Sequence, residues 1–418
     1  MALTATGLVY WDPSAGSNDY AGYFDPSMAG AGTNYPAAQA APILSPTDLA
    51  CTSGSTTVTS ATGGFTAAMV GNGLWITGGT NFVAGLYVIT GRTDANTITV
   101  DQTPVSGGDG TSGTGNVAGR RAVWTDAVWE TYVPGITNYV LATATMTLTE
   151  ALNIAIDGTA VAPISVFGMT SAGALNPTGD NRPLIDCGGY AALGSTATFW
   201  RFRDLRITTT ATNGFFVGNS SNVRNCKVTN TSTTTGRKAL MTSAYAIVTD
   251  CELSSSYGQG LSLGASASVL RTYVHDCNQG AGTREGIALG NACTLLECIV
   301  DTCTVAVQAA AVTGGELNRC TLYSGTTGID ASTAYSMILE NNVVASFTTG
   351  LDWDTATPLN VWQNNDIWDC GTDRVNVAAG TGDNDVDPSF TDAANGDFSL
   401  ASGSGILDTG IGMALGVG

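Results

Sequence analysis

The chain has 418 residues, of which 12% are charged and 43% are hydrophobic. Its 34 acidic residues outnumber its 15 Lys and Arg residues and give a formal net charge of −19. An acidic chain without a run of basic residues is not expected to bind nucleic acid or anionic membranes. The sequence has no apolar stretch long enough for a spanning helix, so we also predict no membrane insertion.

Residues 1–42 are rich in Gly, Ala, Asp and aromatic residues and show no clear period. Such a segment is not expected to fold alone, so we interpret it as an extended arm that docks on its own chain or on a neighbouring subunit. The opening residues, MALTATGLVYWDPSAG, lack a charged segment followed by an apolar one, which predicts no secretory signal. Folding in a reducing cytoplasm is then expected.

Residues 43–125 contain separate β segments divided by glycine-rich turns, which predicts a small antiparallel β module. These segments are TTVTS (56–60), GLWITGG (73–79), GLYVIT (85–90) and NTITVD (96–101).

A longer segment, 126–380, contains a repeat that is regular from residue 214 to residue 370. One half of each repeat is a pentad whose second and fourth positions are mostly apolar. The pentads are GFFVG (214–218), ALMTS (239–243), GLSLG (260–264), GIALG (286–290), TVAVQ (304–308), GIDAS (328–332) and GLDWD (350–354). The other half aligns Cys226, Cys251, Thr272, Cys298, Cys320, Asn342 and Asn365, in steps of 25, 21, 26, 22, 22 and 23 residues.

A period in the twenties, built from short strands and polar turns, is typical of a solenoid. The alternation within each pentad predicts half-buried strands that stack in parallel, about 4.8 Å per coil. Stacked asparagines are expected to form an amide ladder, and the aligned cysteines to pack as thiols without disulfide bonds. With one histidine and no C-x-x-C motif, the sequence predicts no metal site and no cofactor.

This G-I-x-L and N-C/N-x-V/I pattern resembles the right-handed parallel β-helix, or pectin-lyase-like, superfamily. The resemblance implies an all-β fold in which a right-handed parallel β-helix (126–380) follows the small module and the N-terminal arm. Residues 381–418, with DNDVDPSF and NGDFSL, resemble the segment that closes many phage and extracellular β-helices. We predict that they form a cap, because the last coil otherwise exposes an unpaired edge and an apolar core.

Three acids carry the candidate catalytic chemistry. Asp330 and Asp352 occupy one outward column in adjacent coils, about 4.8 Å apart, and Asp354 lies about 6.7 Å farther along the strand. Retaining glycosidases hold their two carboxyl groups about 5 to 5.5 Å apart, so this spacing is compatible with catalysis. The motifs of polygalacturonases and the basic, calcium-binding clusters of pectate lyases do not occur. The alternative interpretation is a solvated acidic surface.

A second outward face follows the Cys/Asn column. His275 is expected to stack between Ser254 and Asp301, where an acid could support a general base. The flat aromatic rings suit a sugar-binding platform or a subunit interface, and a surface histidine beside an acid is the structural alternative. The candidate glycan-binding or interface residues are Tyr273, His275, Asp301, Tyr323 and Trp368.

The only basic cluster is formed by Arg201, Arg203 and Arg206, which we interpret as outward side chains that neutralise an acidic surface.

Our first hypothesis is a structural or receptor-binding component of a phage-like virion: a tailspike, fibre or head-decoration protein. It predicts a homo-oligomer, with a trimer favoured, that docks on other virion proteins through its arm and takes a cell-surface glycan as candidate receptor. The second hypothesis is a polysaccharide depolymerase, a glycosidase or a lyase. The third is a bacterial surface adhesin, which would be extracellular.

Overall fold

The computed structural model describes residues 7–125, 129, 132–152, 156–190, 197–211, 213–277, 285–309, 312–334, 336–353 and 361–407. Across these ranges the protein is all-β, and α1 (Tyr35–Ala38) is a short α-helix of four residues. The chain divides into two compact units. Unit 1 comprises Met1–Asp186 and Ala197–Arg206, and unit 2 comprises Cys187–Thr196 and Ile207–Gly418. No helix in the described ranges is both long and apolar enough to cross a membrane.

Unit 1 contains a closed antiparallel barrel, as expected for the small module in 43–125. Neighbouring strands follow the order β3-β4-β7-β6-β5-β8, and β-branched and aromatic side chains fill the interior, among them Val58, Ile76 and Tyr87. The strands are β3 (Leu49–Cys51), β4 (Thr57–Ser60), β5 (Gly73–Thr80), β6 (Gly85–Asp94), β7 (Thr97–Val100) and β8 (Gly110–Val117), with a 3-10 turn, η1, at Ala67–Met69.

The described part of segment 1–42 packs into unit 1. Strand β1 (Leu8–Trp11) pairs in parallel with β9 (Thr137–Leu141) and antiparallel with β2 (Tyr23–Phe24). Trp11 is fully buried, and its indole N–H donates to Asn138 Oδ1 at 3.0 Å. These residues therefore dock on their own chain. The remaining elements of unit 1 are β10 (Met146–Thr147), β11 (Ile164–Met169), the 3-10 turn η2 (Gly179–Asn181), β12 (Leu184–Asp186) and β13 (Trp200–Arg203).

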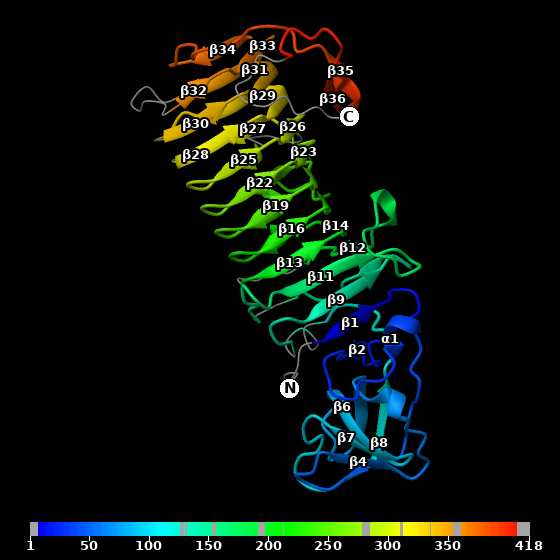
Figure 1. The fold of residues 1–418 in the computed structure, drawn as a ribbon. Helices are drawn as coiled ribbons and strands as arrows, with labels where there is room; N and C mark the ends of the chain where they lie inside the picture. The colour runs from blue at the N-terminus through cyan, green and yellow to red at the C-terminus, as the bar shows by residue number, and fades with distance from the viewer. Residues whose placement is uncertain are drawn as a thin grey trace. The chain divides into compact units, whose positions relative to one another are not determined.

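Unit 2 is a coil of short parallel strands, which appear as a ladder in Figure 1. One side of the ladder is β16 (Asn222–Arg224), β19 (Ile247–Thr249), β22 (Ser268–Leu270), β25 (Thr294–Leu296), β28 (Thr313–Asn318), β30 (Ser336–Glu340) and β32 (Val361–Gln363). A second is β14 (Arg206–Thr209), β17 (Lys227–Asn230), β20 (Glu252–Ser255), β23 (Tyr273–His275), β26 (Ile299–Asp301) and β33 (Asp366–Trp368). A third is β15 (Asn213–Val217), β18 (Arg237–Thr242), β21 (Gly258–Ser262), β24 (Glu285–Ala288), β27 (Val305–Gln308) and β34 (Thr372–Val375). The long strands β29 (Thr321–Ala331) and β31 (Val343–Trp353) belong to the second and third sides together.

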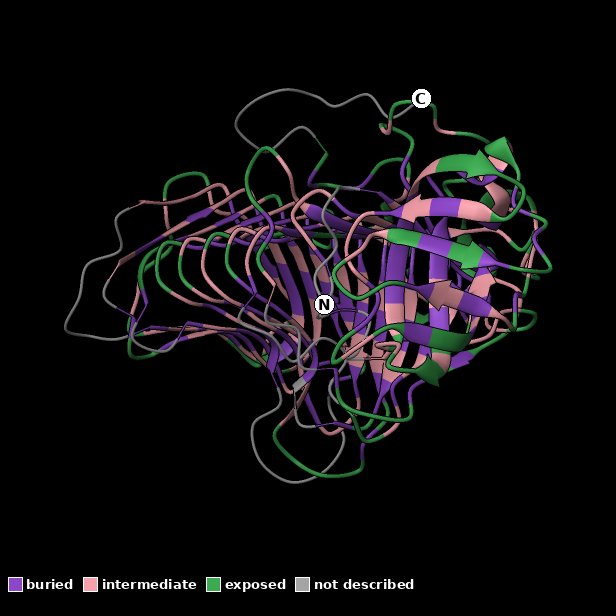
Figure 2. Ribbon diagram, turned by 90° about the horizontal axis from the view of Figure 1, so that it is seen from below, coloured by how far each residue is buried: buried purple, intermediate pink, exposed green. Residues whose placement is uncertain are grey.

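The Cys/Asn column forms inside this coil, as the repeat predicts. Cys298 and Cys320 are buried thiols that donate to the carbonyl oxygens of residues one coil earlier, each at 3.6 Å. The Asn342 amide donates to Asn365 Oδ1 at 2.9 Å. The Asn365 N–H in turn donates to Asp383 Oδ1 at 2.9 Å, so a buried carboxylate ends the ladder. Figure 2 shows the outcome: buried residues follow the strands, and exposed residues gather mainly in the turns.

One part of the predicted register is wrong. The alignment of 304–308 placed Ala306 beside Ala288, but β24 and β27 pair Ala288 with Gln308. The error is two residues, which leaves Val305 and Val307 facing the core. A shift of two preserves the alternation of inward and outward side chains, so hydrophobic periodicity cannot detect it.

Candidate functional site

We define the lateral face of unit 2 as the outward side of β20, β23, β26 and the first part of β29, the second side of the ladder. The strands β20, β23, β26 and β29 place Ser254, His275, Asp301 and Tyr323 in one column. His275 therefore lies between Ser254 and Asp301, as the repeat alignment predicts.

Both nitrogens of His275 are engaged by acids. Its Nδ1 lies 2.8 Å from Asp276 Oδ2, and its Nε2 lies 3.4 Å from Glu252 Oε1. The hydrogen bond with His275, together with the Lys227 ammonium 2.6 Å away, lowers the pKa of Glu252 to about 2. Burial lowers the pKa of His275, but the hydrogen bonds and charges of Glu252 and Asp276 outweigh burial and raise it above its ordinary value. The imidazole is thus held in an ion-pair network, which favours its charged form over a proton-accepting one.

Tyr273 connects this network to Asp301. Its ring stacks on His275 with centroids 4.5 Å apart, and its hydroxyl donates to Asp301 Oδ2 at 3.3 Å. Burial raises the pKa of Tyr273 and of Asp301, and their proximity adds to the rise for Tyr273. A neutral tyrosine hydroxyl beside an aspartate that keeps its proton to higher pH is a pair that can exchange a proton with a ligand. Here Tyr273 is half-buried and Asp301 is buried.

The chain's own tail packs on this face. The rings of Phe390 in β35 (Phe390–Asp392) and Phe398 in β36 (Asp397–Leu400) lie 5.8 and 5.4 Å from the Tyr323 ring. A side chain at Gly396, next to the 3-10 turn η3 (Ala393–Asn395), would lie 3.2 Å from the Tyr273 hydroxyl. Trp368, two coils beyond Tyr323 in the same column, is half-buried. The predicted aromatic platform is thus partly occupied by an intramolecular contact.

The acidic column is assembled on the third side of the ladder. Asp330 in β29 and Asp352 in β31 are register partners in adjacent coils, and Gln308 precedes them in the same column. Asp330 Oδ1 accepts hydrogen bonds from the Ser332 hydroxyl at 2.7 Å and the Ser332 N–H at 3.2 Å. Burial and, to a smaller extent, the neighbouring Asp330 raise the pKa of Asp352. Two adjacent carboxyl groups can divide acid and base roles. Asp354 lies outside the described residues.

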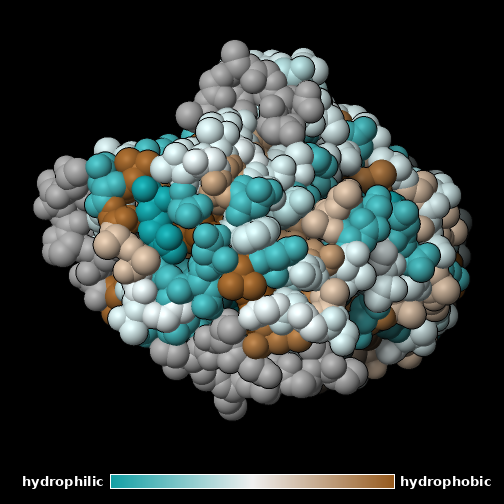
Figure 3. All heavy atoms as spheres, turned by 90° about the horizontal axis from the view of Figure 1, so that it is seen from above, coloured by the Kyte–Doolittle hydropathy of each residue, from teal (hydrophilic) through white to brown (hydrophobic). Residues whose placement is uncertain are grey.

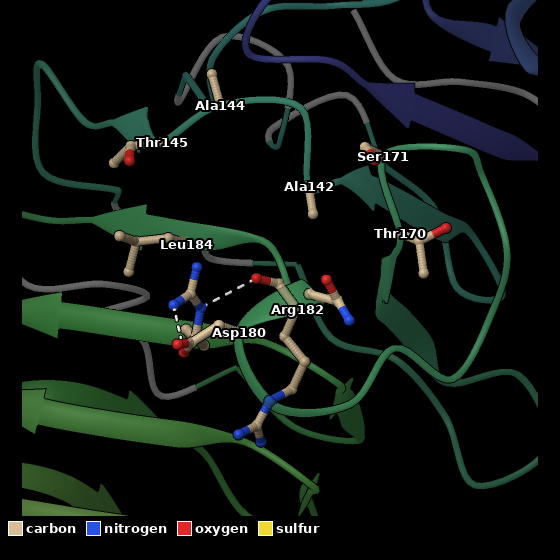
Figure 4. Close-up of a pocket in the computed structure, with 10 residues that line it drawn as sticks. Ala142, Ala144, Thr145, Thr170, Ser171, Asp180, Arg182 and Leu184 are labelled. Carbon is tan, nitrogen blue, oxygen red and sulfur yellow. Dashed lines mark hydrogen bonds and ion pairs between the residues drawn. The ribbon is translucent and has the colours of Figure 1, made fainter.

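A polar pocket in unit 1 was not predicted. Its volume is about 250 Å³, and Figure 4 shows Thr145 and Leu184 on one side with Thr170 and Ser171 on the other. The lining residues are Ala142, Ala144, Thr145, Thr170, Ser171, Asp180, Asn181, Arg182, Leu184 and Arg206.

An ion pair fixes one wall of this pocket. Arg206 Nη1 lies 2.7 Å from Asp180 Oδ1, and Arg206 Nε donates to the Arg182 carbonyl oxygen at 3.1 Å. Sequence reasoning grouped Arg206 with the surface arginines, and its pairing with an exposed acid agrees with that interpretation. Its place in a pocket could not be predicted, because the other lining residues lie 22 or more residues earlier in the chain, outside the regular repeat.

The described ranges contain no group of three or more His, Cys, Asp or Glu side chains arranged to hold a metal ion. On the face drawn in Figure 3, hydrophobic residues form small groups separated by hydrophilic ones.

Comparison with known proteins finds similar architectures. The model of the right handed beta helix region matches residues 239–391. The crystal structure of pectate lyase Pel9A is 12% identical and superposes with a TM-score of 0.53, over 69% of this chain and 85% of that one. A rhamnogalacturonan lyase is 12% identical with a TM-score of 0.43, over 65% and 86% of the two chains. The Dettilon tailspike protein (gp208) is 11% identical with a TM-score of 0.35, over 65% and 61%. No curated protein matches the sequence.

The match to the family model and the likeness to pectate lyase Pel9A show the fold: the protein contains a right-handed parallel β-helix. They do not extend to activity, because one superfold supports many unrelated functions.

Proposed function

We propose that this protein is a structural component of a phage-like particle that binds a glycan through the pocket in unit 1. Its place in a particle, as a tailspike, fibre or head-decoration subunit, is supported by the resemblance of its repeat and tail to those of virion β-helices. Glycan binding is supported by a single observation, the convergence of hydroxyl, amide and guanidinium groups on one small cavity.

The chemistry of the pocket favours a neutral sugar. The Arg206 guanidinium is a donor, whereas the Asp180 carboxylate that neutralises it is an acceptor. Thr145, Thr170 and Ser171 add hydroxyl groups that both donate and accept. Sugar hydroxyls have the same double character, so they can be satisfied here without a net charge. At about 250 Å³ the pocket is smaller than most drug-sized clefts, which suits one sugar residue of a longer glycan.

The experiment is a glycan-array screen followed by calorimetric titration of the best neutral oligosaccharide. We expect Arg206→Ala to weaken binding about 10- to 100-fold, because it removes a charged hydrogen-bond donor from the pocket. Arg201→Ala is the matched control, since Arg201 lies on the preceding strand of the chain, β13, and is exposed. Equal affinity of both variants and the wild type would exclude this pocket as the glycan site.

We propose in addition that the protein self-associates, with a trimer favoured, and contacts other virion proteins through its N-terminal arm, residues 1–42. Light scattering of the purified protein at neutral pH measures the association state directly. A monomer at all accessible concentrations would contradict a self-assembling spike.

Polysaccharide depolymerisation is the second candidate, and the stacked pair Asp330–Asp352 is the observation that favours it. If the pair is catalytic, Asp352→Asn will abolish cleavage of a polysaccharide panel and leave glycan binding in unit 1 unchanged. Asp369→Asn, at an exposed position of the same unit, controls for the loss of one negative charge. A wild-type protein that cleaves no member of the panel would count against this candidate.

A further inference from the structure

The C-terminal strap, which we define as residues 385–406, runs from the last coil back over the lateral face. Just before it, Asn384 adds one more rung to the coil: the Ile367 N–H donates to its carbonyl oxygen at 3.1 Å. The strap then leaves the coil, and its hairpin packs Phe390 and Phe398 on Tyr323. Its turn reaches Tyr273 at Gly396.

Asp366 lies where the strap begins, and its carboxyl group is incompletely satisfied. The residue is 3% exposed. Its Oδ1 accepts the N–H of Val386, the second residue of the strap, at 3.0 Å. Its Oδ2 is buried without a hydrogen-bond partner in the described structure. A buried carboxylate with an unpaired oxygen is costly, and a proton on that oxygen removes the cost.

The two carboxylates at the start of the strap act on Asp366 in the same direction as its burial. Asp385 and Asp387 face it from the strap, and Arg374 faces it from β34. Burial is the main cause that raises the pKa of Asp366 to about 6, and the two strap carboxylates add to it. The Val386 hydrogen bond and the Arg374 charge oppose this rise without cancelling it.

We propose that the strap is a pH-dependent cover of the lateral face, closed when Asp366 is protonated and loosened when Asp366 ionises beside Asp385 and Asp387. With the strap released, Asp366 is solvated and its pKa returns to about 3.9. The closed state therefore binds the proton more tightly, so closure is fully favoured below about pH 4 and weakens as the pH rises through 6. Two pKa units correspond to about a 100-fold change in the closing equilibrium.

Opening would uncover Tyr323 and the Tyr273–Asp301 pair, a surface distinct from the pocket in unit 1. The inference therefore does not depend on the proposed glycan site.

Hydrogen exchange of the strap tests the device. The reporter is the Ala401 N–H, which donates to the Ser389 carbonyl oxygen at 2.9 Å within the strap. After correction for the intrinsic rate, we expect its protection in the wild type to fall by up to about 100-fold between about pH 4 and about pH 7.5. Asp366→Asn should abolish this dependence and keep the strap closed, whereas the exposed control Asp369→Asn should behave as the wild type.

A second pair of variants keeps the proposal testable should Asp366→Asn fold poorly. Replacing both Asp385 and Asp387 by Asn should shift the midpoint of the wild-type transition to lower pH, because two repelling charges are lost. Phe398→Ala should lower protection at every pH by removing the contact with Tyr323. Protection that is independent of pH in the wild type, or a pH dependence that survives in Asp366→Asn, would overturn the proposal.

Discussion

The clearest prediction concerns Asp383, the carboxylate at which the internal ladder ends. Its side chain is 1% exposed and accepts the backbone N–H of Asn365 at 2.9 Å and of Gly380 at 2.7 Å. It also accepts the indole N–H of Trp362 and pairs with Arg374 Nη2 at 3.3 Å. Asp383→Ala leaves all four donors without this acceptor.

The expected cost follows from what remains buried. Removing one partner of a buried ion pair costs about 3–5 kcal/mol, because the other charge stays uncompensated. The orphaned N–H groups add to this cost, and water that enters at the coil end reduces it, so we expect a loss of about 3–5 kcal/mol. Asp383→Asn keeps one carbonyl acceptor and should cost less, about 1–3 kcal/mol.

Urea denaturation measures the total loss, and hydrogen exchange shows where it falls. In a solenoid each coil contacts only its neighbours, so protection should drop in the last coils and remain in the central ones. Asp369→Asn is the control and should change stability by less than about 0.5 kcal/mol, since Asp369 is exposed and Asn tolerates its left-handed backbone. A loss under about 1 kcal/mol for Asp383→Ala, with the last coils still protected, would refute the role of Asp383 as the end of the ladder.

Two further predictions follow from single positions. A Cβ at Gly286 would lie 2.4 Å from Val300 Cγ1, so Gly286→Ala should destabilise the protein by about 1–3 kcal/mol in thermal unfolding, whereas Gly78→Ala, with its nearest atom at 3.8 Å, should not. Because the chain has one histidine, its imidazole NMR signal can be titrated alone; it should report a pKa above the ordinary 6.5, and Glu252→Gln should lower that pKa. The stability that protonated His275 contributes is then present below about pH 6.5 and lost as the pH rises through its folded-state pKa, and an unshifted titration would contradict the ion-pair network.

The elements that could be predicted are those that the repeat specifies more than once. Cys298, Cys320, Asn342 and Asn365 each occupy the same inward position, and a misplaced coil would expose or orphan a polar group in its neighbour. Register on the inner face is therefore strongly determined, and the column could be aligned from spacing alone. The pairing of Asp330 with Asp352 followed from the same alignment.

The pocket and the strap contact could not be predicted for a different reason. The pocket is formed by non-repeating turns, so no period relates Thr145 and Thr170 to Arg206. The tail was expected to cap the end of the coil. The positions of Phe390 and Phe398 in the sequence do not indicate which surface their rings contact. Only the folded chain shows that these rings meet Tyr323 on the lateral face.

The two-residue error at 304–308 indicates where sequence reasoning is weakest in this fold. A shift by two exchanges Ala306 for Gln308 at the position that alternates with Val305 and Val307, and the two valines stay in the core in either register. The free energy of burial is then insensitive to the choice, so patterns of apolar residues determine the inner face and leave the outer one undetermined. The candidate acid pair, Asp330 and Asp352, lies on this outer face. The side chain next to Asp330 in its column is therefore the amide of Gln308, which the sequence alignment did not predict. Gln308 should be included in any test of whether Asp330 and Asp352 contact a sugar.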